Sequence, residues 1–302
     1  MDPLVITQIV VGAAQDILFA FAVGTLACAA MLGRQGAASA AALGRWRLGA
    51  LCVLALVCCL YLWLQAGVMG GTPFAGAGPM VSAVLTQSHF GIAWTVGFAG
   101  VVLAALAGTR DRRPAWSRAA AGAIVYAAAE AAATHAADAG DFTLREAVHV
   151  VHLCATAVWA GSVIVAACVL CRWSNPASGT PARRAAFSAH LSHLATVALG
   201  VVIVTGIYNA TLDTAHLTAP LLSVLYGRVL TLKLLFVTLA VLLGGYNRMT
   251  YLPKLQATAA DGGRAFRDVQ RRFDRLLVIE AMAMLAVLTV AAVLGRTSPS
   301  GG

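Results

Sequence analysis

The sequence predicts an all-α fold, a polytopic membrane helical bundle of about eight transmembrane helices that forms a single domain over residues 1–302. Of these residues 60% are hydrophobic and 11% are charged, whereas a soluble domain contains about 25% charged residues. Stretches of roughly 20 apolar residues, enough to cross a bilayer core as a helix, recur along the whole chain. Because the alternating polarity of transmembrane β-strands is absent, helices are favoured over a barrel.

Eight segments have the length and composition of membrane-spanning helices, which satisfy their backbone polar groups internally. In chain order they are 4–32, 47–68, 86–108, 117–137, 146–172, 187–212, 224–247 and 275–295. The longest loop, 248–274, precedes the last span. In and after it, Phe266, Val269, Phe273 and Leu276 have helical spacing. This pattern fits either a helix lying on the inner leaflet or an extension of the last span.

Lysine and arginine are concentrated in the loops after the first, third, fifth and seventh spans. They are Arg34, Arg45 and Arg47; Arg110, Arg112, Arg113 and Arg118; Arg172, Arg183 and Arg184; and Arg248, Lys254, Arg264, Arg267, Arg271, Arg272 and Arg275. Basic loops remain in the cytoplasm, so both termini are predicted to be periplasmic, with the chain in a bacterial inner membrane. The net charge of +9 therefore reflects topology, and we expect the lipid bilayer and no nucleic acid as partner.

Five of the seven histidines map to the periplasmic side of this topology. His149 and His152 are three residues apart at the end of the fifth span, so they share a helix face. Trp159 lies further along that face, and His135 closes the fourth span, which a short loop joins to the fifth. Neutral imidazole binds copper, zinc, iron and nickel, so we predict His135, His149 and His152 as metal ligands. The alternative is three interfacial histidines that bond loop backbone.

Met69, His89 and His216 form a second group of candidate ligands on the same side. Tyr61, Gln65 and Met69 follow one helical stripe that ends at the periplasmic face. Thioether and imidazole together favour copper over zinc, and Cu(I) in particular, although the oxidation state stays open. The alternative for the methionine is simple packing.

Polar side chains inside the spans predict a path for ions, because such groups are costly in hydrocarbon and usually functional. The sixth span carries a stripe of Thr205, Asn209, Asp213 and His216, which fits an entry path or interhelical hydrogen bonds. The predicted pathway residues are Asp16, Glu130, Trp159, Asn209 and Asp213.

The carboxylates within the spans must be partnered or protonated. Arg228 and Lys233 are candidate partners. Glu280 lies near a basic loop, and we interpret it as a member of a structural ion pair.

Two cysteines, Cys168 and Cys171, share a helix face as a CxxC, which suits either a Cu(I) exit site or, as we prefer, helix packing. The sequence contains no nucleotide-binding loop, nucleophile elbow or zinc-protease helix, so we predict that the protein is not an enzyme.

Several motifs resemble those of the copper resistance protein D family. His152-Leu-Cys-Ala-Thr-Ala-Val-Trp159-Ala-Gly161 is similar to the family's HLxAxxxWxG, and Tyr226-Gly-Arg228-Val-Leu-Thr-Leu-Lys233 is similar to its YGRxLxxK. Thr134-His135-Ala136 resembles the Gly-His-Ala that closes the preceding helix, with threonine in place of glycine. Glu280 fits the acidic residue of the family's last helix, and Met69-Gly70 fits the end of its second. His89 and His149 are additions to the pattern.

The resemblance implies an inner-membrane protein of copper homeostasis that moves copper from the periplasm toward the cytoplasm, with a periplasmic copper-binding partner of the CopC type. The alternative from another class is a membrane haem protein that transfers electrons or reduces metal. Such a protein needs histidines on facing helices, and His135 with His152 are the candidates.

Overall fold

The structure is a computed structural model that describes residues 3–32, 37–108, 113–133, 143–172, 180–212 and 225–295. Within these ranges all regular elements are helices, and eight of them are long. The long helices are α1 (Pro3–Leu32), α2 (Ala37–Gly70), α4 (His89–Leu106), α5 (Arg113–Ala132), α6 (Leu144–Arg172), α7 (Pro181–Leu212), α9 (Leu225–Tyr246) and α11 (Gly263–Leu294). The shorter elements are η2 (Phe74–Gly76), α3 (Gly78–Gln87), the π-helical turn η5 (Asn247–Tyr251) and α10 (Leu252–Thr258).

The predicted polytopic helical membrane bundle is confirmed, because each predicted span coincides with one of these long helices. In the part of the chain that the structure describes, seven helices are long and apolar enough to cross a membrane, all but α5. Helix α5 is rich in alanine, which is only mildly apolar, and it also carries Arg118 and Glu130.

Two predicted boundaries differ from the structure. The third predicted span begins at 86, but the helix breaks at Ser88, whose side chain caps α4 by accepting a hydrogen bond from Gly91 N at 3.0 Å. The last predicted span begins at 275, but α11 is continuous from Gly263. Phe266 and Phe273 are buried on one side of this helix. The segment before 275 is therefore an extension of the last helix and not a separate surface helix.

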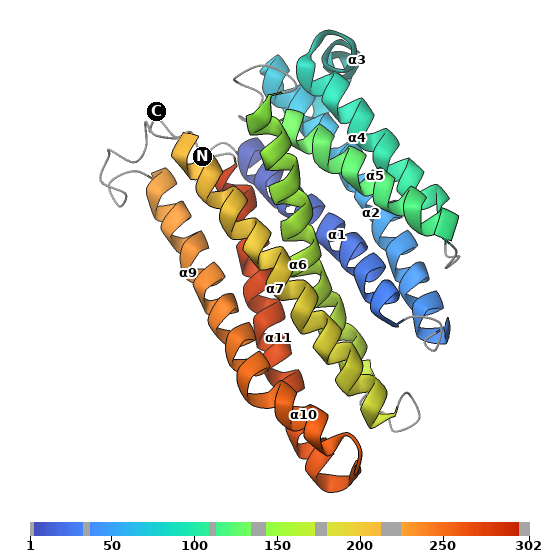
Figure 1. The fold of residues 1–302 in the computed structure, drawn as a ribbon. Helices are drawn as coiled ribbons and strands as arrows, with labels where there is room; N and C mark the ends of the chain where they lie inside the picture. The colour runs from blue at the N-terminus through green and yellow to red at the C-terminus, as the bar shows by residue number, and fades with distance from the viewer. Residues whose placement is uncertain are drawn as a thin grey trace.

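Helices α1 and α6 pack against each other in the middle of the bundle (Figure 1). Helices α2, α4 and α5 lie on one side of them, and α7, α9 and α11 lie on the other. The close approach of α1 and α6 requires glycine: a Cβ on Gly161 would lie 1.8 Å from the Ala20 carbonyl oxygen, and one on Gly24 would lie 2.1 Å from that of Gly161. Small residues that let two backbones meet are typical of helix pairs in membranes.

The beginning of α1 and the end of α11 lie at the same end of the bundle (Figure 1). This arrangement is what an even number of crossings produces. The orientation that places both termini in the periplasm stays a prediction, which rests on the distribution of basic residues.

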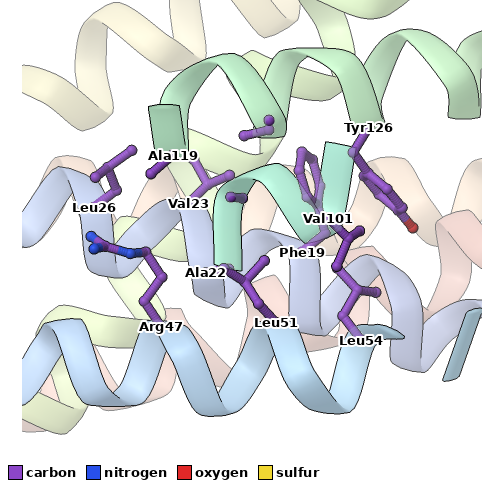
Figure 2. A pocket seen from close by; sticks show the side chains of 13 residues that line it. Phe19, Ala22, Val23, Leu26, Arg47, Leu51, Leu54, Val101, Ala119 and Tyr126 are labelled. Atoms are coloured by element: carbon purple, nitrogen blue, oxygen red, sulfur yellow. The ribbon is translucent and has the colours of Figure 1, made fainter. Parts of the chain in front are cut away.

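The helices α1, α2, α4 and α5 enclose a small cavity of about 20 Å³. Figure 2 shows it lined mainly by apolar side chains, among them Phe19, Leu51 and Leu54, with Arg47 and Tyr126 at its two ends. The Arg47 guanidinium is buried and donates to the Gly108 carbonyl oxygen at 2.9 Å. This half of the bundle is thus closely packed, and its interior has room for about one water at most.

Candidate functional site

Two imidazoles face α7 near the beginning of α6, and they form the centre of the candidate site. The rings of His149 and His152 are nearly parallel, with centroids 6.3 Å apart and planes inclined by 14°. This geometry follows from their spacing of three residues on one helix. Both residues are partly buried between α6 and α7.

Thr205 on α7 determines which nitrogen of His152 carries the hydrogen. The His152 Nδ1 atom lies 2.9 Å from Thr205 Oγ1. The threonine hydroxyl already donates to the Val201 carbonyl oxygen at 2.6 Å, so it can only accept from the imidazole. The neutral His152 ring is therefore protonated at Nδ1, and its Nε2 lone pair is available to a metal ion. A hydrogen bond of this kind at the second nitrogen is typical of metal-ligating histidines.

Asn209 lies one helical turn beyond Thr205 on α7 and faces the second imidazole. Its amide nitrogen is 3.5 Å from His149 Nδ1, at the outer limit of a hydrogen bond. The Asn209 amide oxygen is buried and has no partner among the described atoms. An amide N–H can only donate, so in this contact His149 Nδ1 is the acceptor. The predicted polar stripe of α7 thus meets the histidines of α6.

A charged group acts on this pair from a neighbouring helix. The ammonium of Lys233 on α9 is close enough to interact electrostatically with both imidazoles. It also interacts electrostatically with the carboxylate of Asp16 on α1. The two imidazoles therefore lie within electrostatic range of a basic side chain on α9.

The remaining predicted ligands are not brought to the imidazole pair in the part of the chain that the structure describes. His135, Asp213 and His216 lie outside the described residues. His89 is the exposed first residue of α4, and Met69 is half exposed at the end of α2. Within the described ranges no three side chains among His, Cys, Asp and Glu gather to hold a metal ion. His149 and His152 thus supply two donors, and a complete ligand set requires others.

Glu130 belongs to a second polar cluster, between α1, α2 and α5. Its charge and that of Asp16 both act on the Tyr126 hydroxyl. The amide of Gln15 donates to the Cys58 thiol at 3.3 Å in the same cluster. Two of the predicted pathway residues, Asp16 and Glu130, therefore lie close to the α1–α5 side of the bundle.

Trp159 is 3% exposed and lies two turns beyond His152 on α6. It lines a cavity of about 260 Å³ between α6, α7, α9 and α11. Glu280 on α11 lies in the wall of the same cavity. The tryptophan therefore stands between the imidazole pair on one side and the cavity that contains Glu280 on the other.

The ion-pair interpretation of Glu280 is wrong. In the part of the chain that the structure describes, Glu280 has no ion pair, and it is Asp274 of the same helix whose carboxylate accepts from Arg184 on α7. The Glu280 carboxylate lies against Gly244 on α9, where a Cβ would be 2.7 Å from Oε1. Sequence reasoning missed Gly244 as the neighbour of this carboxylate, and Ser188 and Asn247 in the wall of the same cavity, because all three belong to other helical elements. The feature of the sequence that could have indicated a close contact here was the Gly244-Gly245 pair within an apolar span.

Comparisons with known protein families give two matches. The model for the N-terminal domain of copper resistance protein D-like proteins matches residues 1–144. The model for copper resistance protein D matches residues 185–294. A comparison with curated proteins and one with solved structures gave no match. The two matched segments contain all of the long helices except α6 and the first residues of α7.

Proposed function

Because the chain belongs to the copper resistance protein D family and forms a multi-pass membrane bundle with a role in copper resistance, we propose that it binds copper at the His149–His152 pair and moves it across the bacterial inner membrane. Copper ions reach this pair from the periplasm and pass toward the cytoplasm. A periplasmic copper-binding protein of the CopC type delivers them.

The observation that carries the proposal is the hydrogen bond between His152 and Thr205, which directs a free imidazole lone pair away from α7. Nitrogen donors suit both oxidation states of copper. His135, which the sequence places at the end of the fourth predicted span, supplies the third imidazole. Met69, His89 and His216 are the donors that receive copper before it reaches the pair.

Passage through the bundle uses the groups that lie beyond the imidazoles. Asn209 and Asp213 on and after α7 form the entrance, and Trp159 closes the way below His152. The charges of Asp16 and Glu130 offset that of the cation inside the bundle. The membrane potential favours inward movement by about 2.3 kcal/mol per charge per 100 mV.

Copper binding is tested by replacing both imidazoles in the full-length protein. We expect His149→Ala with His152→Ala to abolish tight copper binding, measured as copper content and affinity of the purified protein. The matched control is His190→Ala with His193→Ala, which removes two exposed histidines at the same spacing from the opposite end of α7. Equal copper affinity in the two double variants contradicts the assignment of the ligands.

Transport is tested separately, with the protein in lipid vesicles that contain a copper-sensitive fluorophore. We expect copper to enter vesicles that hold the unaltered protein and not those with the His149→Ala, His152→Ala variant. If the unaltered protein binds copper but moves none, the protein is a copper-binding scaffold and the transport part of the proposal is wrong.

The haem alternative requires a different arrangement of the histidines. Two histidines three residues apart on one helix lie on the same side of it, so His149 and His152 cannot bind the two opposite faces of one haem. The other candidate pair includes His135, which lies outside the described residues. An optical spectrum of the purified protein tests this pair, because bound haem gives a Soret band and copper does not.

A further inference from the structure

The larger of the two cavities lies between α6, α7, α9 and α11. It is far from the imidazole pair along these helices. Its volume is about 260 Å³, far above the roughly 10–15 Å³ that a single water requires. The wall combines apolar side chains with polar ones, namely Ser188, Ser192, Thr196, Asn247, Arg248 and Glu280. An apolar cavity stays dry, but one with several hydrogen-bonding groups holds water.

Glu280 lies in the wall of this cavity with only 6% of its surface exposed. Its carboxylate lies in the space that a side chain at position 244 would occupy, since a Cβ on Gly244 would be 2.7 Å from Oε1. The adjacent Gly245 has no atom within 4 Å of a Cβ built on it. One glycine of the pair therefore makes room for the carboxylate, and the other does not.

Two further polar atoms of the wall are buried and have no partner among the described atoms. They are the hydroxyl oxygen of Ser188 and the amide oxygen of Asn247. Asn247 is held in place because its amide nitrogen donates to the Phe273 carbonyl oxygen at 3.3 Å. It begins the π-helical turn η5, a deviation that is frequent at functional sites. Buried polar atoms without protein partners normally bond ordered water, so these atoms indicate that the cavity is hydrated.

The donor atoms in this wall are oxygens, which do not suit copper as well as imidazole or thiolate does. Arg248 is the charged residue besides Glu280 in the lining. Its guanidinium donates to the Ser192 carbonyl oxygen at 3.0 Å and to the Thr196 hydroxyl. Helices α6 and α7 contribute Trp159 and hydroxyl groups but no charge to the lining, and α1, which packs on α11 as well, contributes no residue to it.

We propose that this cavity is a proton-exchange site, in which Glu280 takes up and releases a proton through water that fills the space between α7, α9 and α11. The proton leaves a carboxyl oxygen of Glu280 for a cavity water and passes along the water toward Arg248 and Thr196, which lie at the outer side of the cavity wall. A proton returns to Glu280 along the same water in the opposite direction. The site is separate from the imidazole pair and does not depend on copper being bound there.

The test is infrared spectroscopy of the copper-free, full-length protein in lipid, titrated over pH in H₂O and in D₂O. We expect a carboxylic acid C=O band that disappears as the pH rises and that shifts within minutes of exchange into D₂O. Glu280→Gln should remove this band from the difference spectrum, and Glu280→Asp should retain it at a shifted position. Helical circular dichroism of each variant confirms that the bundle is intact.

A glycine outside the cavity supplies the matched control. Gly244→Ala places a methyl group against the Glu280 carboxylate, so we expect it to shift the band and its titration. Gly200→Ala on α7, where a Cβ meets no atom within 4 Å and which does not line the cavity, should leave both unchanged. A Glu280→Gln spectrum identical to that of the unaltered protein overturns the proposal, as does a band that does not exchange in D₂O. A band that moves with the sodium or potassium concentration at constant pH also overturns it, in favour of a metal cation.

Discussion

The two halves of this bundle bury very different interiors. Between α1, α2, α4 and α5 the cavity measures about 20 Å³ and is lined mainly by apolar side chains (Figure 2). Between α6, α7, α9 and α11 it measures about 260 Å³ and contains Glu280, Ser188 and Asn247. Apolar and small side chains let helices close on one another, whereas buried polar groups without protein partners keep space for water. The two interiors thus differ more than tenfold in cavity volume, and the first half is the more closely packed of the two.

The largest effect is expected where the two halves meet. Gly161→Leu introduces a side chain whose Cβ alone would lie 1.8 Å from the Ala20 carbonyl oxygen, so α1 and α6 cannot keep their contact. We expect a loss of more than about 4 kcal/mol of stability, which amounts to failure to fold. The measurement is the yield of monodisperse protein in detergent. Gly200→Leu on α7 is the control, because a Cβ there meets no atom within 4 Å; similar yields from both variants would contradict the tight α1–α6 crossing.

A smaller effect should distinguish the two cavities directly. Leu54 and Leu277 are both at most 2% exposed and line the small and the large cavity respectively. We expect Leu54→Ala to cost about 2–5 kcal/mol, since it leaves an empty space in a dry interior. Leu277→Ala should cost less, because the new space joins one that already holds water. Thermal unfolding of the two variants in one detergent measures the difference, and an equal or reversed order would break the comparison.

The smallest effect concerns the hydrogen bond that orients one imidazole. Thr205→Val removes the acceptor of His152 Nδ1–H while keeping the shape of the side chain. Loss of such a partner typically lowers metal affinity about 10- to 100-fold, so we expect copper affinity to fall by that factor with little change in stability. Thr211→Val serves as control, because that hydroxyl bonds only the Tyr208 carbonyl oxygen of its own helix. Copper affinity unaltered by Thr205→Val would remove the stated role of this hydrogen bond.

The sequence predicted helix positions more accurately than it predicted partners. The pairing of His149 and His152 followed from their spacing, and the family was expected from motifs around His152 and Lys233. The two family matches confirm the family, and they include the Lys233 motif but not the stretch around His152. The ion pair assigned to Glu280 was wrong, because nearness to a basic loop along the chain does not determine which side of the helix a carboxylate faces. The ligand roles of Met69, His89 and the histidines stay predictions, as do the absence of an enzymatic activity and the inner-membrane location.

The sequence by itself determined that this protein is a membrane bundle of long helices, because hydrocarbon admits a backbone only when its polar groups pair within each segment and roughly 20 apolar residues are needed to cross it. Only the tertiary structure decided that Thr205 meets His152 and that Glu280 lies against Gly244 in the wall of a cavity. The composition of a helix specifies that it enters the membrane, but its facing partners depend on the packing of helices far apart in the chain, where small residues such as Gly24 and Gly161 determine which surfaces can meet.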